Sequence, residues 1–261
     1  MSPAQETLLR KVKHEKQHFI TGYFVGGDPN IASSVQLIKE AVASGLDVVE
    51  LGIPSKNPFL EGEVIKRAHK RSIQHFCEYD DYLSFLQVLR REISVPIWIM
   101  GYAEDIIHTK LYKKLVDEKY MDGLIIPNLS LMEGNALKRE LANTGVQVIP
   151  VVNNEMNDSY LNAVLENCNF VYCQIYQGKT GSEIKDFTTL PLFQEKIRKL
   201  TNAALMAGFG IKTPNIAKQV LQAGFDGVVV GSEIVRIIEE NSKVLSSFIE
   251  SLVAAKYRGN S

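Results

Sequence analysis

Two glutamates are the residues of this chain best suited to exchange protons with a substrate. Glu50 closes the apolar run 47–51, where a carboxylate is costly unless it is paired, hydrogen-bonded or used in chemistry. Glu61 lies in a polar loop further along the chain. A carboxylate fixed on a strand and a second one on a loop suit an acid and a base that meet around a substrate. The alternatives are a structural salt bridge for Glu50 and a favourable interaction with a helix dipole for Glu61.

Glycine-rich turns follow the last two apolar runs. Gly208 and Gly210 flank Phe209, while Gly231 and Ser232 open the last helical pattern. Such glycines let backbone N–H groups approach an anion, and a helix N-terminus favours negative charge. The same residues can instead make only tight turns and a helix cap. We interpret Gly210, Gly231 and Ser232 as a phosphate site, with Phe209 beside the substrate.

A third glycine-rich segment, residues 177–181, follows the sixth apolar run. Its glycines permit hinge motion, so we expect a lid that closes over the phosphate and brings the Thr180 hydroxyl near the anion. The full Walker A spacing is absent, which argues against a nucleoside triphosphate. A plain exposed loop is the alternative.

Tyrosines lie on or at the ends of three apolar runs, at Tyr23, Tyr102 and Tyr172. A single aromatic residue at a strand end is more often part of the core than of a site. Three of them on one face indicate a flat apolar or aromatic portion of the substrate. We therefore expect all three to contact it.

Eight apolar runs must position these residues, and most are followed by an amphipathic stretch. The runs are continuous rather than alternating, which is typical of parallel strands covered on both faces. They span residues 19–25, 47–51, 95–101, 123–127, 146–151, 169–174, 203–207 and 226–231. This alternation predicts an α/β fold, a (β/α)8 TIM barrel with an extra N-terminal helix and a long loop between the second strand and the second helix.

An open doubly wound sheet is the structural alternative, because it also alternates strands and helices. It would place a G-x-G-x-x-G turn after the first strand, and residues 26–29 do not contain it. With 261 residues, the chain has the length of one barrel, so we expect a single domain over residues 1–261. The long connection 52–94 is of the size that is usually functional at the catalytic face.

Composition argues against several classes of partner and ligand. Lys and Arg number 29 against 30 Asp and Glu, so no basic excess favours nucleic acid or an anionic membrane. No apolar run approaches the ~18 residues of a membrane span, and the charged N-terminus is unlike a signal peptide. Three cysteines without a C-x-x-C pair fit reduced thiols, and we expect a cytoplasmic protein with a small-molecule substrate. The spacing of the histidines does not match that of metal ligands, so no metal site is expected. The histidines are His14, His18, His69, His75 and His108.

Several motifs, in order along nearly the whole chain, resemble the tryptophan synthase alpha chain family. They are residues 27–29, 50–54, Pro58 with an acidic residue three positions later, 180–181, 208–211 and 231–235. The resemblance implies a (β/α)8 lyase of tryptophan biosynthesis that cleaves indole-3-glycerol phosphate to indole and glyceraldehyde 3-phosphate without a cofactor. It also implies a pyridoxal-phosphate-dependent beta chain as the partner that receives the indole.

The resemblance implies a role for individual residues. Glu50 matches the catalytic glutamate, which handles the protons at the indole C3 and at the side-chain hydroxyl. Glu61 falls on the second catalytic acid, normally an aspartate that polarises the indole N–H. Tyr172 matches a tyrosine beside the substrate, and the phosphate ligands correspond to Gly181, Gly210, Gly231 and Ser232.

Departures from the family pattern cluster on the catalytic and partner-facing side. Two aspartates of the family's loop are here Asn57 and Glu61, and Lys56 adds a positive charge. Glutamate is one methylene longer than aspartate, and misplacing a catalytic group by about 1 Å can cost on the order of a hundredfold in rate. Asn57 stands where the alpha chain reaches the beta chain, so we expect an altered interface at Lys56 and Asn57.

Three functions are compatible with this pattern. The first is an indole-3-glycerol-phosphate lyase, acting as a subunit or alone. The second is a barrel lyase or aldolase with a different phosphorylated substrate, and the third is a weakly catalytic protein that activates a beta chain. The retained Glu50 and the acidic residue at position 61 favour the first.

Overall fold

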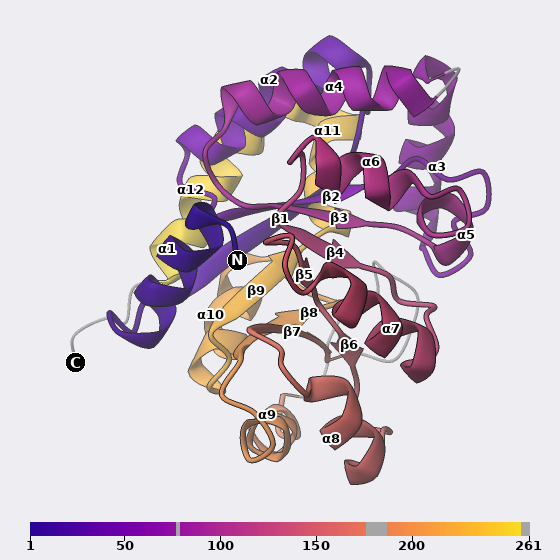
Figure 1. The fold of residues 1–261 in the computed structure, drawn as a ribbon. Helices are drawn as coiled ribbons and strands as arrows, with labels where there is room; N and C mark the ends of the chain where they lie inside the picture. Colours follow the sequence, from indigo (N-terminus) through magenta and orange to yellow (C-terminus); the bar gives the residue numbers. More distant parts are fainter. Residues whose placement is uncertain (77–78, 176–186, 257–261) are drawn as a thin grey trace.

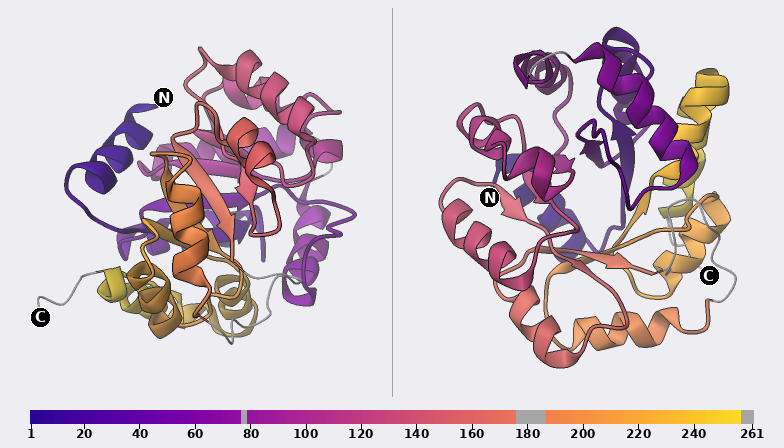
Figure 2. Two further views of the ribbon diagram at one scale, coloured as in Figure 1. Left: turned by 90° about the horizontal axis from the view of Figure 1, so that it is seen from below. Right: turned by 90° about the vertical axis from the view of Figure 1, so that its right-hand side faces the viewer.

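A computed structural model describes residues 1–76, 79–175 and 187–256 of the chain. Its described strands form one parallel sheet that curls into a barrel, with helices around the outside (Figures 1 and 2). The strand order is β5-β4-β3-β2-β1-β9-β8-β7-β6. The strands are β1 (Phe19–Val25), β2 (Val48–Gly52), β3 (Ile97–Met100), β4 (Gly123–Ile125), β5 (Gln147–Val148), β6 (Val151–Val152), β7 (Phe170–Gln174), β8 (Ala204–Gly208) and β9 (Gly227–Val230).

The two short strands β5 and β6 are halves of the fifth predicted strand. Pro150 lies between them and has no N–H to donate, so the regular ladder is interrupted there. The Ile149 N–H still donates to the Leu124 carbonyl of β4 at 2.9 Å, and the Pro150 carbonyl accepts from the Tyr172 N–H of β7 at 2.9 Å. This one segment therefore joins both sides of the sheet, as the predicted barrel requires.

Helices cover the outer face of the sheet (Figure 1). Four of these helices begin with a side-chain cap that accepts a backbone N–H of the first turn. The capping residues are Asn30, Ser130, Asn157 and Thr213. The last helical pattern, which opens at Ser232, folds as two helices separated by a short 3-10 turn. The outer helices are α2 (Ile31–Ala43), α3 (Glu63–Ser72), α4 (Tyr79–Glu92), α5 (Ala103–Ile106), α6 (Leu111–Asp117), α7 (Leu131–Leu141), α8 (Asp158–Leu165), α9 (Leu190–Arg198), α10 (Pro214–Gln222), α11 (Ser232–Asn241) and α12 (Leu245–Lys256).

The extra N-terminal helix, α1 (Pro3–Lys13), covers one end of the barrel. Its buried residues Leu8 and Val12 belong to the same apolar cluster as the inward-facing Phe19, Trp98 and Phe170. The rings of Phe19 and Trp98 meet edge to face, with centroids 6.3 Å apart. Because large rings fill this part of the interior, the space for a ligand lies at the carboxyl ends of the strands.

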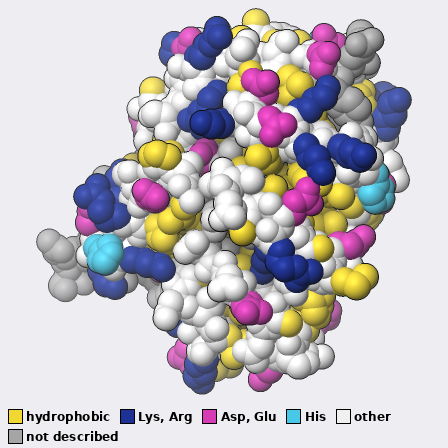
Figure 3. Space-filling view, in the orientation of Figure 1, with side chains coloured by type: hydrophobic (Ala, Val, Ile, Leu, Met, Phe, Trp, Pro, Cys, Tyr) yellow, Lys and Arg dark blue, Asp and Glu magenta, His cyan; other side chains and the backbone are white. Residues whose placement is uncertain are grey.

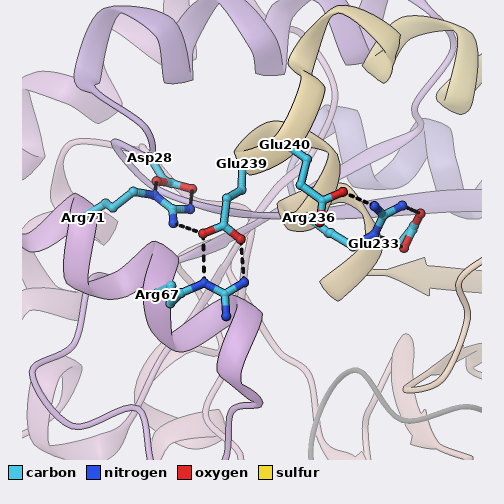
Figure 4. Close-up of polar contacts among 7 residues, drawn as sticks. All are labelled: Asp28, Arg67, Arg71, Glu233, Arg236, Glu239 and Glu240. Atoms are coloured by element: carbon cyan, nitrogen blue, oxygen red, sulfur yellow. Dashed lines mark hydrogen bonds and ion pairs between the residues drawn. The ribbon is translucent and has the colours of Figure 1, made fainter.

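An ion-pair network ties α3 to α11 (Figure 4). Arg71 binds the buried carboxylate of Asp28 through two nitrogens at 2.7 and 2.9 Å, and it reaches Glu239 at 2.5 Å. Arg67 also binds Glu239 through two nitrogens, at 2.9 and 2.6 Å. Asp28 follows β1, so the network joins the turn after that strand to both helices.

Charged side chains of both signs are interspersed over the face seen in Figure 3. Within the described ranges, no helix is both long enough and apolar enough to cross a membrane.

Candidate active site

A pocket at the carboxyl ends of the strands brings together most of the residues singled out from the sequence. The predicted residues that line it are Tyr23, Glu50, Glu61, Tyr172, Phe209, Gly210, Gly231 and Ser232. Apolar side chains complete its wall: Ile65, Met100, Ile211 and Val229. These residues come from strands and loops far apart in sequence, and the barrel closure places them around one space.

Glu50 is buried on β2, with 1% of its surface exposed. Neither of its carboxyl oxygens accepts a hydrogen bond from any residue that the structure describes. Burial, and secondarily the charge of Glu61, raises the pKa of Glu50 to about 8. The salt-bridge alternative therefore finds no partner among the described residues, and Glu50 is mostly protonated at neutral pH.

Glu61 is buried too, and it lines the same pocket as Glu50. Its backbone N–H donates to the Pro58 carbonyl at 3.1 Å, which fixes the end of the loop. The acidic residue in the first turn of α3 is Glu63, and its side chain is exposed. Because Glu63 already favours the helix dipole, the burial of Glu61 calls for a different explanation.

His69 is a site residue that the sequence reasoning missed. It is buried on α3; its Nδ1 accepts the Ser55 N–H at 3.1 Å, and its Nε2 lies 3.3 Å from the Tyr23 hydroxyl. Burial lowers the pKa of His69 to about 4, so the ring is neutral. The helical spacing of His69 from Ile65 indicates an inward-facing residue, but it gives no sign of a partner on β1.

Two glycines make room for the tyrosines of the pocket. A β-carbon at Gly52 would collide with the Tyr23 hydroxyl, and one at Gly208 would collide with the Tyr172 hydroxyl. Burial raises the pKa of both tyrosines well above the usual value, and the charges of Glu50 and Glu61 add to the effect. Both tyrosines are therefore neutral donors and acceptors beside the carboxyl pair.

Tyr102 lies next to the pocket but not in its lining. Its hydroxyl accepts the Leu60 N–H at 3.3 Å, and its ring stacks on Phe59 with centroids 4.6 Å apart. Tyr102 thus holds the loop that carries Glu61. The two predicted lid residues, Thr180 and Gly181, lie outside the described residues.

The loop after β8 adopts an uncommon backbone conformation. Phe209 and Gly210 have φ values of +75° and +81°, and the first is a region that side chains rarely adopt. The ring of Phe209 meets Tyr172 edge on, with centroids 6.1 Å apart. Backbone strain of this kind clusters at ligand sites.

The helix α11 begins at the pocket. Its first residue is Ser232 and its N-cap is Gly231, which makes no side-chain capping bond. The alternative in which Ser232 is the cap is therefore wrong. Glu233 in the first turn is held by Arg236 at 3.0 and 2.5 Å (Figure 4), so the nearest carboxylate is neutralised. The helix N-terminus is arranged to favour an anion.

Comparison with known proteins decides the family. Residues 9–258 match a sequence model described as tryptophan synthase alpha chain. The chain belongs to the tryptophan synthase alpha chain family. Membership in this family confirms three predictions from the sequence. They are the resemblance carried by the motifs, the (β/α)8 barrel, and the activity class of a carbon–carbon lyase.

Other members of the tryptophan synthase alpha chain family match this chain over nearly its whole length. The alpha chain of Carboxydothermus hydrogenoformans is 30% identical over 242 residues, which are 91% of this chain and 90% of the relative. That of Petrotoga mobilis is 29% identical over 223 residues, covering 84% and 86%. The crystal structure of tryptophan synthase subunit alpha from Legionella pneumophila has a TM-score of 0.86 at 27% identity, covering 98% of both chains.

Three residues that depart from the tryptophan synthase alpha chain pattern, Lys56, Asn57 and Glu61, lie on one loop beside the pocket. Lys56 and Asn57 are exposed, and the Asn57 N–H donates to the Ser55 hydroxyl at 3.2 Å. Phe59 and Leu60 are 45% and 41% exposed. The same loop therefore presents apolar and cationic side chains outward and a carboxyl group inward.

Proposed function

We propose that this chain cleaves indole-3-glycerol phosphate, with Glu50 and Glu61 as the groups that act on the indole and its side chain. The observation that carries the proposal is the carboxyl group of Glu50, buried without a hydrogen-bond partner among the described residues and facing Glu61. A buried acid that nothing in the described fold satisfies is a candidate for chemistry.

The reaction needs one proton moved from the side-chain hydroxyl to the indole C3. With a pKa of about 8, Glu50 holds its proton at neutral pH and acts as the acid toward C3. The carboxylate that remains accepts the proton of the neighbouring hydroxyl while the carbon–carbon bond breaks and the aldehyde forms. Glu50 thus ends as it began, and no water is consumed.

Glu61 supports the same step by its charge. Protonation at C3 makes the indole ring cationic, and its N–H becomes a stronger donor. A carboxylate buried in the same pocket stabilises that developing charge more than it would in water. This role requires Glu61 to be ionised when Glu50 is protonated, so the two acids of the pocket take different parts in the reaction.

The remaining site residues bind and orient the substrate. We assign the phosphate to Gly210, Gly231 and Ser232, with Thr180 and Gly181 closing over it, and we assign the indole to the rings of Tyr23, Tyr172 and Phe209, with Tyr102 holding the loop beside it. Phosphate binding remote from the breaking bond supplies positioning energy.

A tryptophan synthase beta chain is the proposed partner. One structural neighbour is the tryptophan synthase of Mycobacterium tuberculosis, which resembles this fold with a TM-score of 0.86 at 22% identity. The loop with Lys56 and Asn57 is the surface we assign to this contact, because it is exposed and borders the pocket from which indole would leave.

The test is indole formation by the purified protein, alone and with a beta chain. Indole without a beta chain supports a stand-alone lyase, and indole only with it supports a subunit. Absence of indole in both conditions at high enzyme concentration contradicts the proposal. If the added chain nevertheless speeds the beta reaction, the protein is an activator.

A further inference from the structure

We propose that His69 is a positioning residue that directs the hydroxyl proton of Tyr23 toward the carboxyl groups of Glu50 and Glu61. The kinetic consequence of this inference rests on the proposed function. Its physical content concerns the free protein and is testable without substrate.

The hydrogen bonds of His69 fix which ring nitrogen carries the proton. The Ser55 backbone N–H can only donate, so Nδ1, at 3.1 Å, must accept and carries no proton. A neutral ring then holds its proton on Nε2. That proton is donated to the Tyr23 hydroxyl oxygen at 3.3 Å.

Tyr23 therefore accepts from His69, and its own proton is left for another acceptor. The titratable groups that act on Tyr23 from the surrounding elements are Glu61, Glu50, Tyr102 and Tyr82. Tyr23 and Glu50 are paired residues on neighbouring strands, and both line the pocket. An ionised carboxylate is a stronger acceptor than a phenol, so the proton turns toward the glutamates.

This arrangement changes the acid–base balance of Glu50. The groups that face Glu50 are Glu61 from the loop, Tyr23 from β1 and Tyr172 from β7. Glu50 accepts no hydrogen bond from the described residues. Tyr23 therefore acts on it through the dipole of its O–H group, whose positive end stabilises only the ionised form of Glu50 and opposes the effects of burial and of Glu61. Because Ser55 belongs to the loop that carries Glu61, the same ring also ties that loop to the pocket.

The direct test is a titration of Glu50 followed by NMR of carboxyl-labelled glutamate, with the signal assigned by its absence in Glu50→Gln. Tyr23→Phe should raise the midpoint of Glu50 by a fraction of a pH unit, because the O–H dipole directed at the charged carboxylate is lost. Tyr112→Phe is the matched control: it removes a hydroxyl that donates to Glu140, away from the pocket, and should leave the midpoint unchanged.

Two variants of His69 distinguish the effect of its hydrogen bond to Ser55 from that of its hydrogen bond to Tyr23. In His69→Asn the amide oxygen can still accept the Ser55 N–H but the side chain is too short for Tyr23, so the midpoint should rise. In His69→Gln the longer amide can donate to Tyr23, and the midpoint should stay near that of the wild type. Because His69 acts through Tyr23, the double variant Tyr23→Phe/His69→Asn should titrate like Tyr23→Phe alone.

The inference is overturned by an unchanged midpoint in Tyr23→Phe, by additive shifts in the double variant, or by nitrogen NMR that places the His69 proton on Nδ1. None of these readings requires turnover. If the wild type releases no indole, the proposed function fails while the titration still decides this inference. If it releases indole, the pH profile of kcat should shift with the midpoint, with KM little changed.

Discussion

The carboxyl group of Glu50 differs from an ordinary surface glutamate because of what surrounds it. An exposed glutamate is ionised at neutral pH, whereas burial and the charge of Glu61 raise the pKa of Glu50 to about 8. A proton is therefore available inside the pocket at the pH at which the chain would work. A buried Glu50 lowers the stability of the folded chain once its carboxyl group ionises.

That cost predicts a pH dependence of the free energy of unfolding. The unfolded chain loses the Glu50 proton near pH 4.5, whereas the folded chain keeps it to about 8, so stability falls as pH rises between these values. The loss is on the order of 3 to 5 kcal/mol at 1.36 kcal/mol per unit. His69 has the opposite effect on the free energy of unfolding, because its pKa is lowered. Between about pH 4 and 6.5 the unfolded chain binds the His69 proton and the folded chain does not, so stability rises with pH over this range.

Denaturant unfolding of the wild type and Glu50→Gln from pH 5 to 9 isolates the Glu50 contribution, since both chains keep His69. The variant should gain stability relative to the wild type as pH rises. A difference that stays constant over this range would show that Glu50 is not an abnormal acid.

The length of Glu61 yields a second prediction at the residue scale. If Glu61 serves the indole N–H, Glu61→Asp should retain or increase the rate of indole formation, because the family usually carries aspartate there. Glu61→Gln, which keeps the length and removes the charge, should lower kcat by about a hundredfold or more. Equal losses in both variants would contradict a role for the charge alone.

At the scale of the elements, strands and loops place the tyrosines through glycines. Gly52→Ala and Gly208→Ala should push the Tyr23 and Tyr172 rings aside, cost about 1 to 3 kcal/mol and reduce indole formation. Gly134→Ala is the matched control, because a β-carbon there meets no atom within 4 Å on α7, and it should stabilise the chain by about 0.5 to 1 kcal/mol. Equal stability for all three variants in urea unfolding would refute the packing argument.

The helices α3 and α11 depend on their ion pairs to different degrees. Arg71→Gln leaves the carboxylate of Asp28, whose side chain is 2% exposed, without its arginine, and should destabilise the fold by about 3 kcal/mol. Arg67→Gln removes an exposed partner of Glu239 and should have a clearly smaller effect. Thermal unfolding of the two variants side by side measures this, and the reverse order would contradict the network's arrangement.

At the scale of the whole molecule, patterning predicts the barrel. Eight continuous apolar runs must be buried on both faces, the chain has the length of one barrel, and the G-x-G-x-x-G turn of a doubly wound sheet is absent. It does not predict the break in the fifth strand, which depends on how Pro150 sits between two ladders. The carboxyl pair and the glycine turns of the pocket follow from residue types at strand ends. The contact of His69 with Tyr23 does not, because it joins residues 46 positions apart through tertiary packing.

In the proposed function, the carboxyl group of Glu50 transfers both protons of a retro-aldol cleavage. We therefore compare the rate of indole release from indole-3-glycerol phosphate by the wild type and by Glu50→Gln, with a cooperative thermal unfolding transition of the variant as the check of folding. The variant should lose at least about a hundredfold in kcat. A variant that releases indole at the wild-type rate would contradict this role of Glu50.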